Sequence, residues 1–158
     1  MDDVTIVGYR PEHRADFERL NRVWLEGYGL LEDADLEYLQ DPEGHILGRG
    51  GEVYFALRDG RAVGTCAAIP LDAHTVELAK LSVDPALHGR GLGRRLAETV
   101  LDFARARGAR QVVLTSQHGL TAAIRLYESM GFRHAPLPPD IRYVTADVYM
   151  TLALPPRP

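Results

Sequence analysis

Three consecutive segments in the middle of the chain are rich in apolar and β-branched residues and are separated by short runs of turn residues. Asp59-Gly60 separates the first two segments, and its glycine accepts the positive φ that a tight hairpin needs. Pro70 to His74 turn the chain before the third segment. We therefore predict an antiparallel meander with strands at residues 52–58, 61–69 and 75–83.

Apolar residues recur at helical spacing on both sides of this meander. Before it, we predict a short strand at residues 4–8 and a helix over residues 11–27, which begins at a proline. One or two helical turns are expected at residues 36–39. The glycine-rich residues 43–51 are expected to form a loop.

The pattern after the meander is a helix over residues 92–108, a strand at 111–115, a helix over 121–130, and strands that begin at Phe132 and at residues 146–154. A strand, a helix and a strand in this order indicate a parallel crossover. The chain has 158 residues, and domains hold roughly 150 residues on average. We therefore expect a single domain over residues 1–158.

The amino-acid composition argues against several kinds of binding partner and site. Apolar residues make up 46% and charged residues 25% of the chain, which is typical of a globular protein. The net charge of −4, from 18 basic and 22 acidic residues, argues against a nucleic-acid partner. Cys66 is the single cysteine, which excludes an internal disulfide and a cysteine-based zinc site. The six histidines show no ligand spacing, so we expect no metal.

The location of the protein can also be inferred from the sequence. No apolar run approaches the roughly 18 residues of a membrane span, so we expect no membrane partner. The acidic start Met1-Asp2-Asp3 lacks the apolar stretch of a signal peptide. We expect a cytoplasmic protein.

Leu81 to Leu96, with the sequence LSVDPALHGRGLGRRL, form a strand, a glycine-rich turn and the start of a helix. Backbone N–H groups at a helix start lack internal partners, and the helix dipole is positive there, so this end can hold a phosphate or diphosphate. Gly89, Gly91 and Gly93 let the main chain approach an anion closely. Arg90, Arg94 and Arg95 add positive charge.

Two common phosphate-binding motifs do not fit this turn. A P-loop requires Lys-Ser or Lys-Thr after the glycines, and neither is present. A dinucleotide fingerprint would place a third glycine where Leu96 stands, and it belongs in a parallel unit rather than after an antiparallel meander.

The turn and a later segment together resemble the GCN5-related N-acetyltransferases. His88-x-x-Gly91-x-Gly93 resembles the family's Arg/Gln-x-x-Gly-x-Gly/Ala pattern, and residues 127–132 (YESMGF) resemble its Tyr-Glu-x-x-Gly-Phe pattern. The resemblance implies an α+β fold in which a mixed, mostly antiparallel twisted sheet carries helices on both faces. It also implies that acetyl-CoA, the acetyl donor, lies where two strands splay apart.

The resemblance assigns the cofactor-binding residues. The pantetheine is expected along the strand at Leu81, Ser82 and Val83. The diphosphate is expected on the turn formed by His88, Gly89, Arg90, Gly91, Leu92, Gly93 and Arg94. The chain departs from the family at His88, and at Leu120, where many members have an asparagine. Either Thr121 or Ser116 substitutes for that asparagine, or the contact is absent.

Acetyl transfer to an amine needs a base for the amine, donors for an oxyanion and an acid for the leaving thiolate. Glu77 is the candidate base, because the family often has a glutamate there and its apolar neighbours would raise its pKa. A solvated strand glutamate is the alternative. Tyr127 is the candidate acid by resemblance, and a core aromatic residue is its alternative. The oxyanion donor implied by the family is a main-chain N–H near Leu81.

Other reactive side chains have weaker cases. Cys66 has no adjacent base in the sequence and is expected to be a buried structural thiol. His118 follows a predicted central strand, and a surface role is expected for it. Direct transfer in a ternary complex is therefore preferred over an acetylated enzyme.

The family implies that the acceptor binds between the segment after the first helix and the last loops. The segment Trp24 to Leu39 carries five acidic residues, which would attract a cationic amine or simply form a solvated face. Arg142 and Tyr143 are candidates for holding a substrate carboxylate. The acceptor is expected to be a primary amine on a small molecule or a peptide.

Two alternatives to the enzyme remain. One is a catalytically silent acyl-CoA-binding module or sensor, which the presence of both Glu77 and Tyr127 disfavours. The other is a generic nucleotide-binding domain, which the missing P-loop lysine disfavours. Homodimerisation is expected by family analogy only.

Overall fold

The computed structural model describes residues 3–156 and has a seven-stranded sheet in the order β1-β2-β3-β4-β5-β7-β6. The first two and last two residues of the predicted domain, including part of the acidic start Met1-Asp2-Asp3, lie outside the described residues. The strands are β1 (Val4–Val7), β2 (Glu52–Arg58), β3 (Arg61–Pro70), β4 (Thr75–Val83), β5 (Gln111–Ser116), β6 (Arg133–Ala135) and β7 (Val148–Ala153). The α-helices are α1 (Arg14–Gly27), α2 (Asp33–Gln40), α3 (Pro42–His45), α4 (Leu92–Ala106) and α5 (Thr121–Ser129).

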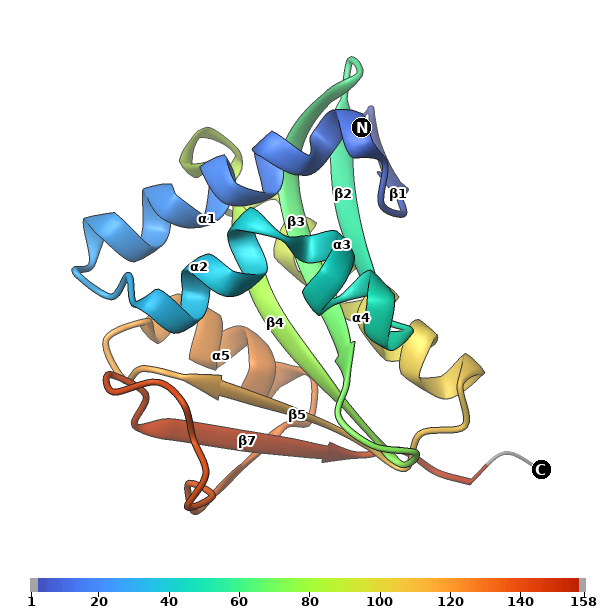
Figure 1. Cartoon of the computed structure of the whole chain (residues 1–158), viewed down its shortest axis with the longest axis vertical. Coiled ribbons are helices and arrows are strands. Elements are labelled where there is room, and N and C mark those ends of the chain that lie inside the picture. Colours follow the sequence, from blue (N-terminus) through green and yellow to red (C-terminus); the bar gives the residue numbers. More distant parts are fainter. Residues whose placement is uncertain (1–2, 157–158) are drawn as a thin grey trace.

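The sheet is mixed, as predicted. The β2-β3-β4 meander is antiparallel. Strand β4 pairs in parallel with β5, and helix α4 connects the two strands along the chain. This parallel pairing covers only three positions and ends where Glu77 faces Val113. Beyond that point the two strands diverge, which is visible in Figure 1 as a widening gap between β4 and β5.

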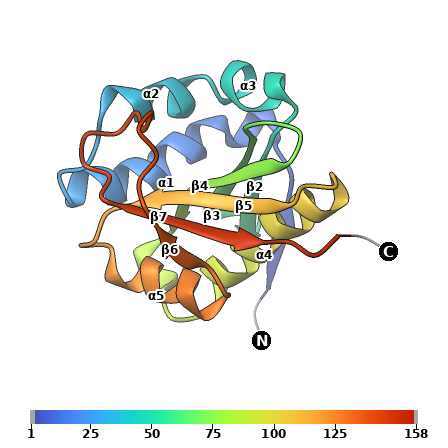
Figure 2. The ribbon, with the colours of Figure 1, turned by 90° about the horizontal axis from the view of Figure 1, so that it is seen from below.

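Two hydrophobic cores lie on opposite faces of the sheet. Helices α1 to α3 cover one face, and α4 and α5 cover the other (Figure 2). Phe17 of α1 packs with Phe55 of β2 in the first core. Leu96 of α4 packs with Val76 of β4 in the second, and all four side chains are fully buried. Strand β4 contributes to both cores, because Ala79 packs against the first and Val76 and Leu78 belong to the second.

One prediction about the segment between α1 and β2 was wrong. Residues 43–51 are not a plain loop, because α3 and a 3₁₀ turn at Leu47–Arg49 occupy most of them. Asp41 starts α3 by accepting a hydrogen bond from the Gly44 N–H at 3.0 Å, and Pro42 takes the first helical position. The helical turns expected at residues 36–39 are confirmed as part of α2, which begins three residues earlier, at Asp33.

Strand β4 contains a β-bulge that the sequence pattern does not predict. Thr65 pairs with Ser82 and Ala67 with Ala79, so Lys80 and Leu81 together face Cys66. Lys80 adopts φ +57°, which is unusual for a residue with a side chain. In a regular strand Lys80 would point away from Ala79's face. The bulge instead turns Lys80 to the α2 side, and Leu81 packs into the α4 core.

Within residues 3–156, no helix is long and apolar enough to cross a bilayer.

Candidate active site

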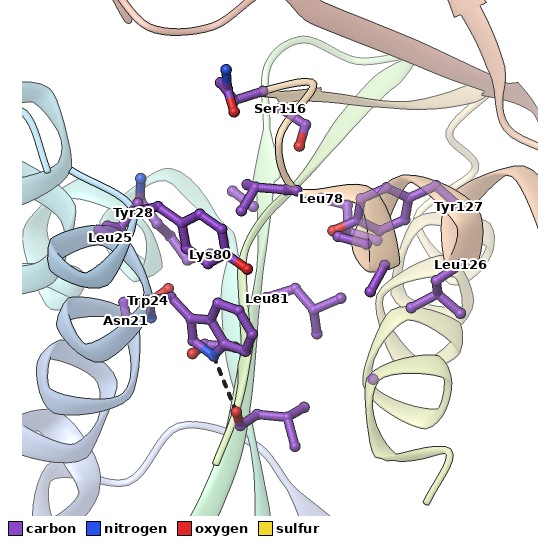
Figure 3. Close-up of a pocket in the computed structure, with 18 of the residues that line it drawn as sticks. Asn21, Trp24, Leu25, Tyr28, Leu78, Lys80, Leu81, Ser116, Leu126 and Tyr127 are labelled. Atoms are coloured by element: carbon purple, nitrogen blue, oxygen red, sulfur yellow. Dashed lines mark hydrogen bonds between the residues drawn. The ribbon is translucent and has the colours of Figure 1, made fainter. Parts of the chain in front are cut away.

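A cavity of about 560 Å³ lies where β4 and β5 diverge. It passes through the sheet: α1 forms its wall on one side, and the glycine turn and α5 form the other (Figure 3). Glu77, Tyr127 and nine of the ten predicted cofactor-binding residues line it. Arg90 is the exception, since it is exposed and does not line the cavity.

The glycine turn has an open backbone at the start of α4. Gly89 and Gly91 have φ values of +78° and +79°, which side chains rarely adopt, and a Cβ atom on either would meet no atom within 4 Å. Helix α4 begins at Leu92, so the N–H groups of its first turn border this open space. The turn therefore fits a diphosphate group by shape, by its backbone donors and by the helix dipole.

His88 and Trp24 fix the end of β4 that leads into this turn. The His88 ring stacks on Trp24 with a centroid separation of 4.9 Å, and Trp24 stacks on Tyr28 at 5.7 Å. The Trp24 indole N–H donates to the Val83 carbonyl oxygen at 3.1 Å, the bond drawn in Figure 3. The His88 Nε2 lies 3.0 Å from the same oxygen. His88 thus contacts the protein, which accounts structurally for an imidazole where the family has Arg or Gln.

The edge of β4 beyond Glu77 faces the cavity, because β5 pairs with β4 only as far as that residue in the described part of the chain. Leu81 and Val83 pack their side chains toward α4. The Ser82 hydroxyl donates to the Leu20 carbonyl oxygen at 2.7 Å and anchors β4 to α1. A main-chain edge without a neighbouring strand can bind an extended, amide-bearing ligand.

Glu77 lies where the parallel pairing ends and lines the cavity. Within residues 3–156, no hydrogen bond or ion pair joins its carboxylate to another residue. Burial raises the pKa of Glu77, although the charges of Lys80 and Arg142 oppose this effect. A half-buried carboxylate with a raised pKa and no protein partner is well suited to exchange a proton with a ligand.

Tyr127 lies on the opposite side of the cavity. Its ring is 6% exposed and packs edge-on against Phe132, with the ring centroids 5.8 Å apart. Figure 3 shows its hydroxyl pointing into the cavity. Burial raises the pKa of Tyr127, so the phenol keeps its proton at neutral pH. Leu120, at the start of α5, offers no side-chain cap, whereas Thr121 and Ser116 both line the cavity.

The acidic residues after α1 are largely engaged by other parts of the protein. Glu32 accepts hydrogen bonds from the Val144 and Thr145 N–H groups, at 2.8 and 2.9 Å, and Glu37 pairs with Arg142. These contacts hold the loop between β6 and β7 against α2 (Figure 2). Because Arg142 is paired with Glu37 and does not line the cavity, the structure does not place it to hold a substrate carboxylate.

Lys80 is a cavity-lining residue that sequence reasoning missed. Its ammonium pairs with Asp35 of α2, and both side chains are almost completely buried, at 9% and 3% exposed. It also donates to the Tyr143 hydroxyl at 3.1 Å. The alternation of a regular strand would place Lys80 on the α4 face of the sheet. The contact with Asp35 exists because of the bulge, which the sequence does not predict.

Cys66 and His118 are placed as expected. The Cys66 thiol is fully buried, and burial raises its pKa, which disfavours the reactive thiolate. His118 is exposed and contacts Asp147. Among residues 3–156, no group of three or more His, Cys, Asp or Glu side chains is arranged to hold a metal ion.

Comparisons with known proteins agree with this geometry. The chain is 37% identical over 115 residues to human N-acetylaspartate synthetase, which covers 72% of this chain and 36% of that protein. The chain thus spans about a third of the length of this curated relative. A GNAT-family acetyltransferase from Staphylococcus aureus Mu50 superposes with a TM-score of 0.88 at 19% identity, over 96% of this chain and 99% of that one.

A further solved structure holds the ligand that the cavity fits. It is a GNAT-family acetyltransferase from Elizabethkingia anophelis with acetyl-CoA bound, with a TM-score of 0.66 at 20% identity, over 98% of this chain and all of that one. At these identities the two solved structures support the fold alone. The model of the acetyltransferase (GNAT) family, however, matches residues 11–132, which is most of the chain. The protein therefore belongs to the GNAT family of acetyltransferases.

Proposed function

We propose that this protein transfers an acetyl group from acetyl-CoA to a primary amine, by direct transfer while both substrates are bound. One observation carries the proposal: a single cavity connects the open glycine turn, the unpaired edge of β4, Glu77 and Tyr127. The turn and the strand edge can hold the donor. The two titratable side chains supply the base and the acid that the reaction needs.

The donor is held by backbone groups more than by side chains. The N–H groups at the start of α4, between His88 and Arg94, bind its diphosphate. The main chain of Leu81 and Val83 pairs with its pantetheine amides, as a neighbouring strand would. When bound, acetyl-CoA supplies the acetyl group as a thioester that an amine can attack.

Glu77 acts as the base. The acceptor enters as an ammonium ion, and Glu77 accepts its proton either directly or through one water molecule, leaving a neutral nitrogen that can attack the acetyl carbon. The raised pKa brings Glu77 closer to the pH at which such a transfer is efficient. The absence of a protein partner for its carboxylate within residues 3–156 leaves it available to the acceptor.

Tyr127 acts as the acid. As the new C–N bond forms and the C–S bond breaks, its phenol donates a proton to the departing sulfur. The nitrogen releases one proton to solvent as it becomes an amide, and solvent returns a proton to the phenolate. Its position across the cavity from α1 separates the acid from the acceptor amine. Packing against Phe132 fixes the ring, so the hydroxyl is held in one direction.

The experiment is a screen of acceptor amines that follows the release of free CoA thiol, together with calorimetry for acetyl-CoA. We expect turnover of at least one amine. The Tyr127→Phe variant keeps the ring packing and should lower kcat at least tenfold while changing the Kd of acetyl-CoA by less than threefold. Unchanged kcat would refute the role of Tyr127. Tight acetyl-CoA binding without turnover of any amine would favour the sensor instead.

A further inference from the structure

The cavity has two halves with different chemistry. The donor half contains the glycine turn and α5. The acceptor half is defined here as the part that faces α1 and α2, with Trp24, Leu25, Tyr28, Leu30, Glu77 and Lys80 along its wall. Figure 3 shows the α1 side chains across β4 from Leu126 and Tyr127. Because the donor is held on one side of the sheet, the acceptor must enter from the other.

The basic side chains that line the cavity already make contacts within the protein. Among the described residues they are Lys80, His88 and Arg94. Lys80 is paired with buried Asp35 and hydrogen-bonded to Tyr143. Arg94 donates to the Ser129 hydroxyl on the donor side, and His88 lies against Trp24. The acceptor half therefore presents no uncompensated positive charge to a ligand.

Its uncompensated charge is negative. The Asp35–Lys80 pair is neutral overall, which leaves the Glu77 carboxylate. In an α-amino acid the carboxylate carbon lies about 2.5 Å from the amine nitrogen. An amine positioned for Glu77 would therefore bring such a carboxylate close to Glu77, with no cation to balance it. Both like-charge repulsion and loss of hydration would weaken binding.

The remaining walls of the acceptor half are mostly apolar, with Asn21, Tyr143 and Thr145 as uncharged polar exceptions. Leu25 and Leu30 line it together with Tyr28, whose ring is stacked on Trp24 and is 52% exposed. A partly exposed ring at the mouth of an apolar cavity offers a flat surface on which a second ring can pack. These residues would gain free energy from covering an apolar acceptor body.

We infer that the acceptor is a primary amine on an apolar, ring-bearing body that carries no carboxylate. The inference rests on the proposed acetyl transfer and specifies its substrate class. It sets this chain apart from its human relative, whose name gives N-acetylaspartate as the product. Aspartate would place two carboxylates in a half-cavity that holds no free cation.

The test compares amines that differ only by a carboxylate: tryptamine with tryptophan, and phenethylamine with phenylalanine, with aspartate as a fifth substrate. The kcat/KM of each is measured by thiol release, and acetyl-CoA binding is measured by calorimetry. We expect each decarboxylated amine to exceed its amino acid at least tenfold in kcat/KM. Equal or better turnover of the amino acids, or of aspartate, would overturn the inference while leaving acetyl transfer established.

Failure of all five substrates would also overturn the inference, and calorimetry then judges the broader proposal. If acetyl-CoA binds, transfer to some other acceptor still stands. If acetyl-CoA does not bind, the proposed function falls as well. The two failures are thus distinguishable.

A pair of variants tests the charge argument directly. Leu30→Arg adds a cation to the acceptor half, and Leu71→Arg adds the same cation at an exposed site that does not line the cavity. We expect Leu30→Arg to reduce the preference for tryptamine over tryptophan at least threefold, and Leu71→Arg to leave it unchanged. Equal effects of the two variants would contradict the inference. Tyr28→Ala, at a half-exposed position that tolerates truncation, should raise KM for tryptamine by a larger factor than KM for ethylamine.

Discussion

Replacing Gly91 with alanine tests whether the conformation of the glycine turn is fixed by the backbone rather than by crowding. Gly91 precedes α4 at φ +79°, and a Cβ atom added there would meet nothing within 4 Å. The cost is therefore conformational. A side chain in the left-handed region costs about 1–2 kcal/mol. Alanine also restricts the unfolded chain more than glycine does, and this effect stabilises the folded state by about 0.4–1 kcal/mol. The two contributions leave a net loss of about 1 kcal/mol.

Gly93, two residues further on, is the matched control. It lies inside α4, has no positive φ, and a Cβ atom there would be in ordinary contact with Leu126 at 3.4 Å. Alanine is more stable than glycine inside a helix by roughly 0.5–1 kcal/mol. We therefore expect the glycine-to-alanine change to lower the stability of the fold at Gly91 and to raise it at Gly93.

Thermal denaturation without ligand measures both effects. About 1 kcal/mol corresponds to roughly 2–4 °C in Tm for a chain of this size. We expect Gly91→Ala to lower Tm by about 3 °C and Gly93→Ala to raise it by about 2 °C. Gly91→Ala should also weaken acetyl-CoA binding, since the new methyl group faces the space assigned to the diphosphate. A rise in Tm for Gly91→Ala would refute the reasoning about the turn.

Two further predictions concern the charged groups of the cavity. Burial raises the pKa of Glu77, so its neutral form stabilises the fold below the unfolded pKa and that contribution is lost as pH rises through the folded pKa. Glu77→Gln should therefore raise Tm at pH 8 but not at pH 4. The same variant should remove the acidic limb of the pH–rate profile. An unchanged profile would assign the base to another residue. Lys80→Met should lower the free energy of unfolding by about 3–5 kcal/mol, because it leaves buried Asp35 unpaired. Urea titrations should show that Lys80→Met with Asp35→Leu loses less than the two single variants together, and strict additivity would contradict the buried pair.

The predictions that succeeded rest on short-range patterns. The meander, the crossover and the strand-turn-helix around Gly91 each follow from neighbouring residues, and the structure confirms them. The family resemblance depended on two such segments, and the family match confirms it. The catalytic roles of Glu77 and Tyr127 stay predictions, although both side chains reach one cavity.

The predictions that failed depend on contacts between distant parts of the chain. Arg142 was a candidate for holding a substrate carboxylate, but it is paired with Glu37 of α2, more than a hundred residues away. Pairing of this kind leaves no signal in the local sequence. Residues 43–51 were misjudged for another reason: their glycines suggest a loop, while Asp41 and Pro42 supply a helix start that outweighs them.

Lys80 is an additional residue in β4, and its removal would leave Ala79, Leu81 and Ser82 alternating as in any regular strand. Both cores would keep their side chains. A bulged strand bends and twists more than a straight one, and this bulge follows the last position paired with β5, at Glu77. If β4 were shortened by that one residue, it could continue straight and pair with β5 beyond Glu77. Lys80 thus has two roles: the bulge that it forms bends β4 beside the gap in the sheet, and its ammonium neutralises buried Asp35.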